Sequence, residues 1–287
     1  MRVVVVGGGR VGTAVAVLLR AAGHDLVAVA GREVTRERAA AHLPGVPVTT
    51  ADEAVPLGDL VLLGIPDDLL SSLVADLAAA GVFFEGQWVV HVSGAAGLGV
   101  LTPVLAAGAR RLALHPLQTF PDVEHALVAL PGCAVAVTAD EEEGYALGED
   151  LARDLGARPF RLADEMRPLY HAAAVFASNY LVTMSGAAER LFAEAGVPEP
   201  VVAMLPLQMA TLANIGALGP AAALTGPAAR GDAGTVAANL QALGAHEPGL
   251  VPAYLVLCRL VLDLAEGAGR LSAERRASVE EVLARWS

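Results

Sequence analysis

The chain has 287 residues, enough for two domains, because single hydrophobic cores seldom grow much beyond about 250 residues. Its 31 acidic and 19 basic residues give a formal net charge of −12, which argues against nucleic acid or an anionic membrane as the main partner and favours a small-molecule substrate. All 19 basic residues are arginine. Schiff-base chemistry, a lysine general acid and a phosphate-binding lysine of the Walker type are therefore excluded.

Two cysteines, Cys133 and Cys258, lie in apolar runs without the spacing of a metal site or a disulfide framework. We expect buried thiols in a reducing cytoplasm and no bound metal. The apolar stretch before the first glycines has only four residues, too short for a secretory signal. Residues 168–188 and 200–229 are uncharged, but polar residues or prolines interrupt them, so we expect helices buried at a domain or subunit interface rather than membrane spans.

The first half of the chain alternates short β-branched runs with amphipathic stretches, which predicts βαβ units around a parallel sheet. The predicted strands are 2–6, 26–30, 59–64, 87–92, 111–115, 132–137 and 158–162. The predicted helical stretches between them are 11–22, 35–42, 67–80, 97–107 and 141–155.

After residue 163 the strand pattern disappears. Pro168 lies near the start of a long apolar helix that we expect to reach Glu194, and all later elements, near 200–215, 232–243, 250–266 and 272–285, are predicted helices. The expected fold is α/β: a doubly wound domain over 1–163, followed by an all-α domain over 164–287 for substrate binding and dimerisation.

A glycine-rich loop, "VVVVGGGRVGTAVAVLL", follows the first predicted strand. Gly7, Gly9 and Gly12 form the pattern G-x-G-x-x-G, in which glycines permit a tight turn and a close approach to a pyrophosphate at a helix N-terminus. We therefore predict a Rossmann-like dinucleotide site here, with Arg10 and Val11 of the same loop against the cofactor. The alternative is a tight turn without a ligand.

The end of the second strand distinguishes the two nicotinamide cofactors. An NAD enzyme usually has an acidic residue there for the ribose 2′-hydroxyl, but this chain has Gly31 and Arg32. Arg32 and Thr35, with Arg36 as a further candidate, suit a 2′-phosphate and predict NADP. Glu33 leaves NAD open.

Two further strand ends lie at the same predicted edge of the sheet. Ile65 and Pro66 end one strand, and Ser93 follows another, where it could face the nicotinamide. A plain strand-to-helix turn explains Ile65 and Pro66 equally well.

Three segments carry candidates for chemistry. In "HPLQTF", His115 could donate a proton, and Gln118 and Thr119 could bind substrate oxygens, although a strand-end histidine bonded to a carbonyl is the simpler alternative. On the long helix, His171, Ser178 and Asn179 are spaced to share one stripe that could face the cleft. The alternative is a buried helix that satisfies its polar groups internally, or a histidine at a dimer contact. In "TGPAARGD", Arg230 could bind a substrate carboxylate or could brace the loop through an ion pair with Asp232.

The three segments "HPLQTF", "RPLYHAAAVFASNYLV" and "LTGPAARGD" behind a Rossmann domain resemble bacterial Rossmann-like proteins whose C-terminal part is a domain of unknown function. Some members of that family are an alternative type of ketopantoate reductase. More broadly, the chain is similar to the 6-phosphogluconate dehydrogenase-like superfamily, in which an NADP domain and a helical domain form the active cleft and the helical part dimerises. The resemblance implies a substrate-facing Asn179, and prephenate dehydrogenases have a similar His-Pro in contact with substrate.

The resemblance fails at one residue. Ketopantoate reductases use a lysine on the first long helix, and this chain has none; Arg167 is too weak an acid to replace it but could orient a carboxylate. We therefore expect an NADP-dependent reductase of a small keto acid, with 2-dehydropantoate as the first candidate. His115 or His171 would be a protonated general acid, or a water relay would replace it, and Asn179 would hold the carbonyl or hydroxyl. An imine or prephenate-type dehydrogenase and a non-catalytic NADP-binding regulator are the alternatives.

Overall fold

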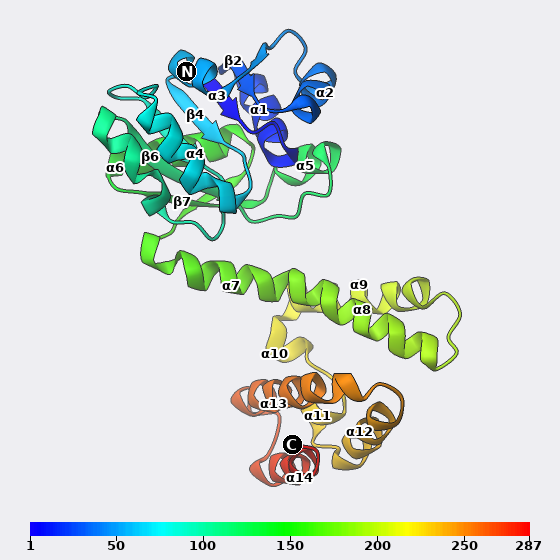
Figure 1. Ribbon diagram of the computed structural model, residues 1–287. Coiled ribbons are helices and arrows are strands. Elements are labelled where there is room, and N and C mark those ends of the chain that lie inside the picture. Colours follow the sequence, from blue (N-terminus) through cyan, green and yellow to red (C-terminus); the bar gives the residue numbers. More distant parts are fainter. The chain divides into compact units, whose positions relative to one another are not determined.

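The computed structural model describes residues 1–287, which form two compact units, Met1–Asn179 and Tyr180–Ser287 (Figure 1). The division falls later than the boundary expected after residue 163. The first unit continues beyond the last strand because Arg167, which begins helix α7 (Arg167–Ala177), is fully buried against the loop that follows β5 (Trp88–His91). Each unit is described separately below.

The N-terminal unit is built on an eight-stranded sheet of order β3-β2-β1-β4-β5-β6-β7-β8. All neighbouring strands are parallel except β6 and β7, which pair antiparallel. The doubly wound α/β fold is confirmed, and its strand order reverses between β1 and β4, where such sheets bind ligands. Besides β5, the strands are β1 (Arg2–Val6), β2 (Asp25–Ala30), β3 (Val48–Thr49), β4 (Leu60–Leu63), β6 (Arg110–Pro116), β7 (Ala134–Ala139) and β8 (Arg158–Arg161).

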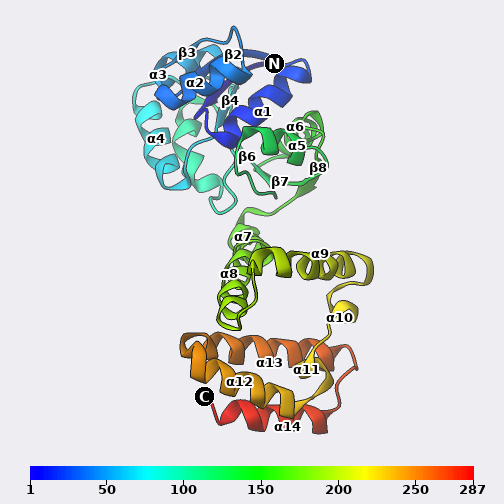
Figure 2. The ribbon, with the colours of Figure 1, turned by 90° about the vertical axis from the view of Figure 1, so that its right-hand side faces the viewer.

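Both faces of this sheet are covered, because successive side chains of a strand point to opposite faces. Val3 and Val5 of β1 pack in the core under one layer of helices, and Val4 and Val6 pack in the core under the other. Helices lie on both sides of the sheet (Figures 1 and 2). The first layer contains α1 (Arg10–Ala21), α2 (Glu33–His42), α5 (Val123–Ala129) and α6 (Glu142–Asp154). The second contains α3 (Ala51–Ala54), η1 (Val55–Leu57), α4 (Asp67–Ala79) and the 3-10 helix η2 (Leu98–Ala107).

The C-terminal unit is entirely helical, as expected. Its buried core lies among α11 to α14, and the fully buried Val236, Leu262 and Val279 come from three of these helices. The elements are α8 (Asn179–Glu194), α9 (Pro200–Leu218), α10 (Pro220–Ala223), α11 (Pro227–Arg230), α12 (Ala233–His246), η4 (Pro248–Leu250), α13 (Val251–Gly267) and α14 (Ala273–Ala284), while η3 (Asp164–Met166) precedes α7 in the first unit.

The long helix expected up to Glu194 is two helices, α7 and α8, with a break at Ser178. The backbone of Ser178 has φ −123° and ψ −66°, outside the helical region, although its N–H still bonds the carbonyl of Ala174. Serine and asparagine favour helix ends because their side chains compete for backbone hydrogen bonds. The pair Ser178 and Asn179 therefore marks the end of one helix and the start of the next.

Other differences concern short elements. Strand β3 and the short helices α3, α5, α10 and α11 were not expected, because segments of two to seven residues carry too little periodicity to recognise. The stretch predicted as a helix at 97–107 is a 3-10 helix, since Gly97, Gly99 and Pro103 disfavour α-helical hydrogen bonding.

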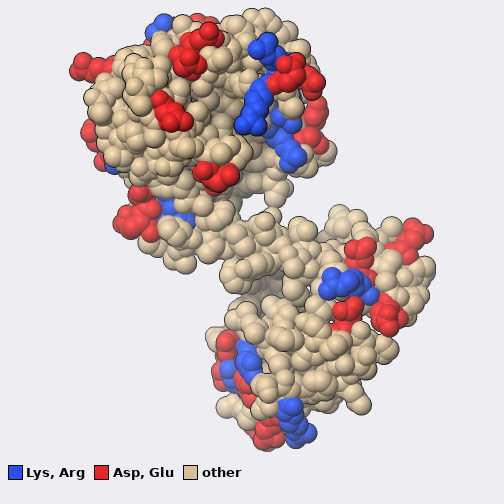
Figure 3. All heavy atoms as spheres, in the orientation of Figure 1, with Lys and Arg blue, Asp and Glu red and all other residues tan.

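Two segments, Pro200–Leu218 and Pro248–Gly267, are long and apolar enough to cross a membrane by length and composition, a test that core helices of soluble proteins also pass. Only 6% of the apolar window of α9 is buried. Val202, Leu205, Met209 and Leu212 follow one another along this helix and are all exposed. Figure 3 shows broad areas of the molecular surface without any charged side chain.

Candidate dinucleotide site

The glycine-rich loop forms a turn that leads directly into α1. Gly7 has φ +97°, a conformation that residues with a side chain rarely adopt, and its N–H bonds the carbonyl of Ala30 at the end of β2 (2.8 Å). Gly9 is the N-cap of α1 and offers no side-chain acceptor to the N–H groups of the first turn. These free N–H groups and the helix dipole suit an anionic ligand.

The loop also packs too closely for larger residues. A Cβ atom on Gly12 would collide with the carbonyl oxygen of Gly7, and a Cβ on Gly64, after β4, would lie 2.9 Å from the Cα of Gly12. Gly7, Gly12 and Gly64 thus bring the start of α1 against the ends of β1 and β4. This is the close helix–strand contact that a pyrophosphate-binding turn requires.

A cavity of about 610 Å³ opens at this edge of the sheet. Most of the cofactor residues predicted from the sequence line it: Gly7, Gly9, Arg32, Thr35, Ile65 and Pro66. The residues come from the ends of β1, β2 and β4 and from α2, which the sheet order brings side by side. The cavity therefore lies at the switch point of the sheet, where the order of the strands reverses.

Several residues of the cavity were not predicted. Arg38 lies on α2, half-buried, and donates a hydrogen bond from Nη1 to the carbonyl of Gly8 (3.3 Å). The sequence gives no periodic signal for this contact, because it joins residues 30 positions apart. The other unpredicted polar and glycine residues of the lining are Gly8, Gly31, Thr50, Gly64, Ser72 and Asp76.

Four predicted cofactor residues, Arg10, Val11, Gly12 and Ser93, do not line the cavity. Val11 packs against the hydrophobic core, and Arg10 reaches the carbonyl of Phe120 (3.5 Å). The hydroxyl of Ser93 donates to Asp67 (2.6 Å) and accepts the N–H of Ala96 (2.9 Å), which secures the loop after β5. Arg36 does not line the cavity either, and its Nε lies 3.8 Å from Oε2 of Glu33.

The residues present fit a dinucleotide with an extra phosphate. The glycine loop and the N-terminus of α1 provide N–H donors for a pyrophosphate, and Arg32 and Arg38 provide two cations beside the end of β2. The last residues of β2 and its following turn, Ala30 and Gly31, carry no carboxylate that would receive a ribose 2′-hydroxyl.

A second polar group lies around His115, at the carboxyl end of β6. Its Nδ1 is hydrogen-bonded to the hydroxyl of Tyr170 on α7 (2.8 Å), and the two rings meet edge to face. Burial, together with the nearby Arg167 and His171, lowers the pKa of His115 to about 4. His115 is therefore neutral near pH 7, contrary to the expectation of a protonated histidine acid. Tyr170 was not singled out in the sequence, because an aromatic residue on an apolar helix is usually a core residue.

Arg167 is fully buried beside this group. Its guanidinium donates to the carbonyls of Ser93 and Ala96 and to the hydroxyl of Thr138. No carboxylate lies within ion-pair distance of it. Its hydrogen bonds join α7 to the loop after β5 and to β7, and they are not directed at a substrate carboxylate.

His91, at the end of β5, is a fully buried histidine that was not predicted as a site residue. Its Nε2 faces the carbonyl of Gly97 (3.3 Å), and its Nδ1 accepts the N–H of Ser93 (3.2 Å). Burial lowers the pKa of His91 to about 4, and the charge of Arg167 acts in the same direction. His91 is thus a neutral structural residue of the loop that carries Ser93.

The remaining candidates on α7 and α8 are separated by the break between the helices. His171 is partly buried, and its Nδ1 has no hydrogen-bond partner. Ser178 lies at the break, and Asn179 is the exposed first residue of α8. The spacing that predicted one continuous stripe applies only to an unbroken helix.

Gln118 and Thr119 are exposed in the loop after β6, where the N–H of Thr119 bonds the side chain of Gln118 (2.9 Å). Arg230 is an exposed residue at the end of α11, in the C-terminal unit. The expected alternative, an ion pair of Arg230 with Asp232, does not form. Asp232 instead caps α12 by accepting the N–H and the hydroxyl of Thr235.

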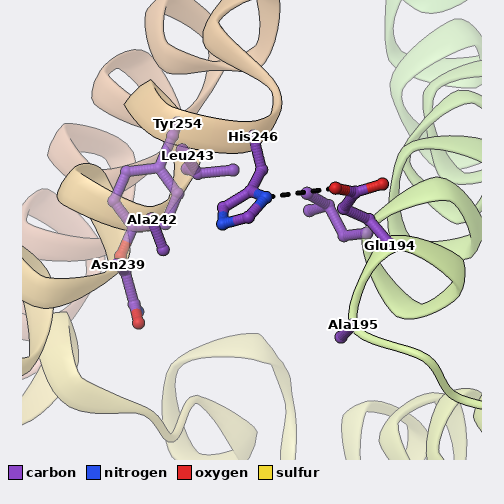
Figure 4. A pocket seen from close by; sticks show the side chains of 8 residues that line it. Glu194, Ala195, Asn239, Ala242, Leu243, His246 and Tyr254 are labelled. Atoms are coloured by element: carbon purple, nitrogen blue, oxygen red, sulfur yellow. Dashed lines mark hydrogen bonds and ion pairs between the residues drawn. The ribbon is translucent and has the colours of Figure 1, made fainter.

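The C-terminal unit has a cavity of its own, of about 470 Å³, between the end of α8 and helices α12 and α13 (Figure 4). Four polar residues line it: His246 Nδ1 and Glu194 Oε1 lie 3.1 Å apart, and Asn239 donates to the hydroxyl of Tyr254 (3.1 Å). The other lining side chains, Leu191, Ala195, Ala242 and Leu243, are apolar. No residue predicted from the sequence lines this cavity.

Comparisons with known proteins agree with this architecture. Residues 1–116 match the family model of the Rossmann-like domain, and residues 133–261 match that of DUF2520, a domain of unknown function. No curated protein matches the chain.

Solved structures share the fold over most of the chain. A candidate NADP oxidoreductase from Bacteroides fragilis is 26% identical, with a TM-score of 0.75 over 91% of this chain and 98% of that one. Protein TM1727 from Thermotoga maritima is 23% identical, with a TM-score of 0.72 over 93% and 100%. An imine reductase from Pseudomonas sp. is 19% identical, with a TM-score of 0.58 over 98% and 92%. The chain therefore carries, in this order, a match to the Rossmann-like domain over residues 1–116 and a match to the DUF2520 domain over residues 133–261.

Proposed function

We propose that this protein is an NADP-dependent oxidoreductase that reduces the ketone of a small keto acid. The observation that carries the proposal is the cavity at the switch point of the sheet, where a glycine loop, the N-terminus of α1 and two arginines converge. The 26% identity with a candidate NADP oxidoreductase supports the same cofactor.

Different residues of the cavity would hold different parts of the cofactor. Gly7, Gly9 and the first turn of α1 would hold the pyrophosphate, and Arg32 and Arg38 would hold the 2′-phosphate. Ile65 and Pro66, after β4, would form part of the wall of the same cofactor site. When bound, NADPH supplies a hydride to the carbon that is reduced.

His115 and Tyr170 favour an enzyme over a non-catalytic regulator. They form a partly buried, hydrogen-bonded polar pair at the carboxyl edge of the sheet. A protein that only sensed NADPH would have no need for a titratable pair at that edge, whereas a reductase must deliver a proton to the reduced oxygen.

The first substrate to test is 2-dehydropantoate, which would be reduced to pantoate. The support is the resemblance of the three segments around His115, Tyr170 and Arg230 to proteins of this type. Imines and prephenate are the other substrates to include, because likeness of fold extends to an imine reductase.

A turnover screen tests the proposal. Purified protein would be mixed with NADPH or NADH and with 2-dehydropantoate, other 2-keto acids or cyclic imines, and separately with NADP+ or NAD+ and prephenate. Absorbance would follow the oxidation of the reduced cofactors and the reduction of the oxidised ones. We expect NADPH oxidation with a keto acid. Tight NADPH binding without turnover of any compound would favour the regulator, and turnover of imines alone would leave the cofactor correct and the substrate class wrong.

A further inference from the structure

His115 and Tyr170 present an arrangement that a lone histidine acid does not need. Tyr170 occupies Nδ1 of the imidazole (2.8 Å), while Nε2 makes no hydrogen bond within the protein. Nε2 lies over the backbone of the segment after β5, since a Cβ on Gly94 would be only 2.6 Å from it. The free nitrogen is therefore next to the loop that follows β5, at the carboxyl edge of the sheet.

We propose that Tyr170 is a positioning residue that donates its hydroxyl proton to Nδ1 of His115, so that the neutral imidazole carries its proton on Nε2 and delivers it to the substrate. The proposal rests on the proposed reductase function and identifies the proton donor of that same site. It explains how a chain without lysine can protonate the reduced oxygen.

The charges around His115 and Tyr170 favour a neutral imidazole. Arg167 and His171 on α7 and His91 on β5 lie close enough to oppose a positive charge on His115, and only Asp67 on α4 favours it. Burial raises the pKa of Tyr170 to about 12, so that the hydroxyl keeps its proton at rest.

The proton transfer balances without a charged imidazole. As the ketone carbon gains a hydride, the π electron pair of the carbon–oxygen bond moves to oxygen, which takes the proton from Nε2 of His115. At the same time Nδ1 takes the hydroxyl proton of Tyr170. The phenolate that remains is stabilised by the Arg167 guanidinium, which lowers the pKa of Tyr170 in opposition to burial. Afterwards Nδ1 returns its proton to the phenolate and Nε2 takes one from water, which restores the pair.

The first test does not depend on activity. In protein labelled with ¹⁵N-histidine, the chemical shifts of the two ring nitrogens report which one carries the proton. We expect His115 of the wild type to be neutral and protonated on Nε2 at pH 7, and Tyr170→Phe to shift the population towards the Nδ1–H form. The control is Tyr145→Phe, a variant elsewhere in the same unit that removes a hydroxyl with no hydrogen-bond partner. This variant should leave the spectrum unchanged. A wild-type His115 protonated on Nδ1 alone, or on both nitrogens, would overturn the proposal.

The second test uses the substrate identified by the screen. Tyr170→Phe and His115→Asn should each lower kcat by at least about 10²-fold with little change in KM or in NADPH affinity. The double variant should be no slower than the slower single one, since both residues act on one proton. Wild-type kcat in Tyr170→Phe would reject the role of Tyr170 while leaving the reductase intact. A wild type that turns over no ketone or imine would reject the reductase function, and the ¹⁵N spectrum would then show independently whether the hydrogen-bonded pair exists.

Discussion

The carbonyl oxygen of Gly7 occupies the space that a Cβ atom on Gly12 would need. Gly9 differs, because the nearest atom to its Cβ would be the Gly64 oxygen at 3.6 Å and its φ of −73° suits any residue. The two glycines of one motif therefore have different roles. Gly12 is required by the packing of the protein, and Gly9 leaves room for the ligand.

Gly12→Ala should consequently lower the free energy of unfolding by about 1–3 kcal/mol, because the new methyl group forces α1 away from the loop. Gly9→Ala should leave stability within about 1 kcal/mol of the wild type and should weaken NADPH binding instead. Thermal unfolding and titration of NADPH by calorimetry separate the two effects. Equal melting temperatures for Gly12→Ala and the wild type would contradict the packing role.

Arg32 and Arg38 should determine the preference for NADPH over NADH. Arg32→Glu should weaken NADPH binding by about 10- to 100-fold, equivalent to about 1.5–3 kcal/mol for a hydrogen bond to a charged group, with little change for NADH. Arg38→Gln should act in the same direction. Arg36→Gln, on the same helix but outside the cavity, is the matched control. If the wild type binds both cofactors equally well, the assignment of NADP is wrong.

Buried His91 should make stability depend on pH. Its pKa is about 4 in the folded protein and near 6.5 when unfolded, so the unfolded chain binds more protons between these values. The stability that neutral His91 contributes is fully present above pH 6.5 and is lost as the pH falls towards 4. The expected loss between pH 7 and pH 5 is about 2 kcal/mol, and the lowered pKa of His115 adds to it.

Urea unfolding at pH 5 and pH 7 measures this difference. His91→Gln should be less stable than the wild type at pH 7 but should show a smaller difference between the two pH values. His125→Gln, at an exposed position on α5, should lose as much stability between pH 7 and pH 5 as the wild type does. If His91→Gln lost as much stability as the wild type between pH 7 and pH 5, His91 would not be the source of the pH dependence.

We propose that the helical unit forms a homodimer through α9. Val202, Leu205, Met209 and Leu212 expose between 49% and 64% of their surface along one helix, more apolar area than a soluble monomer usually presents. Light scattering should show a dimer at micromolar concentration. Leu205→Glu with Met209→Glu should yield monomers, whereas Val128→Glu, at an isolated exposed position of the N-terminal unit, should not. A wild type that is monomeric would contradict the proposal.

The sequence by itself determined the class of fold and the place of the cofactor loop. The alternation of β-branched runs with amphipathic stretches, and the order glycine loop then helix, are local patterns that hydrogen bonding and burial impose within a few residues. Gly7, Gly9 and Arg32 could therefore be predicted as cofactor residues from the order of amino acids alone. The change from strands to helices after residue 163 was equally visible, because it is a change of period along the chain.

Only the tertiary structure decided which residues meet. The contact of His115 with Tyr170 joins residues 55 positions apart, and Arg38 reaches Gly8 across 30 positions, and neither pairing leaves a periodic signal. The protonation of His115 depends on its burial beside Arg167, which is a property of the packed site and not of the residue type. The break at Ser178 could not be predicted either, since a long apolar stretch permits a continuous helix and a broken one alike, and a serine within it ends the helix only where the backbone leaves the helical region.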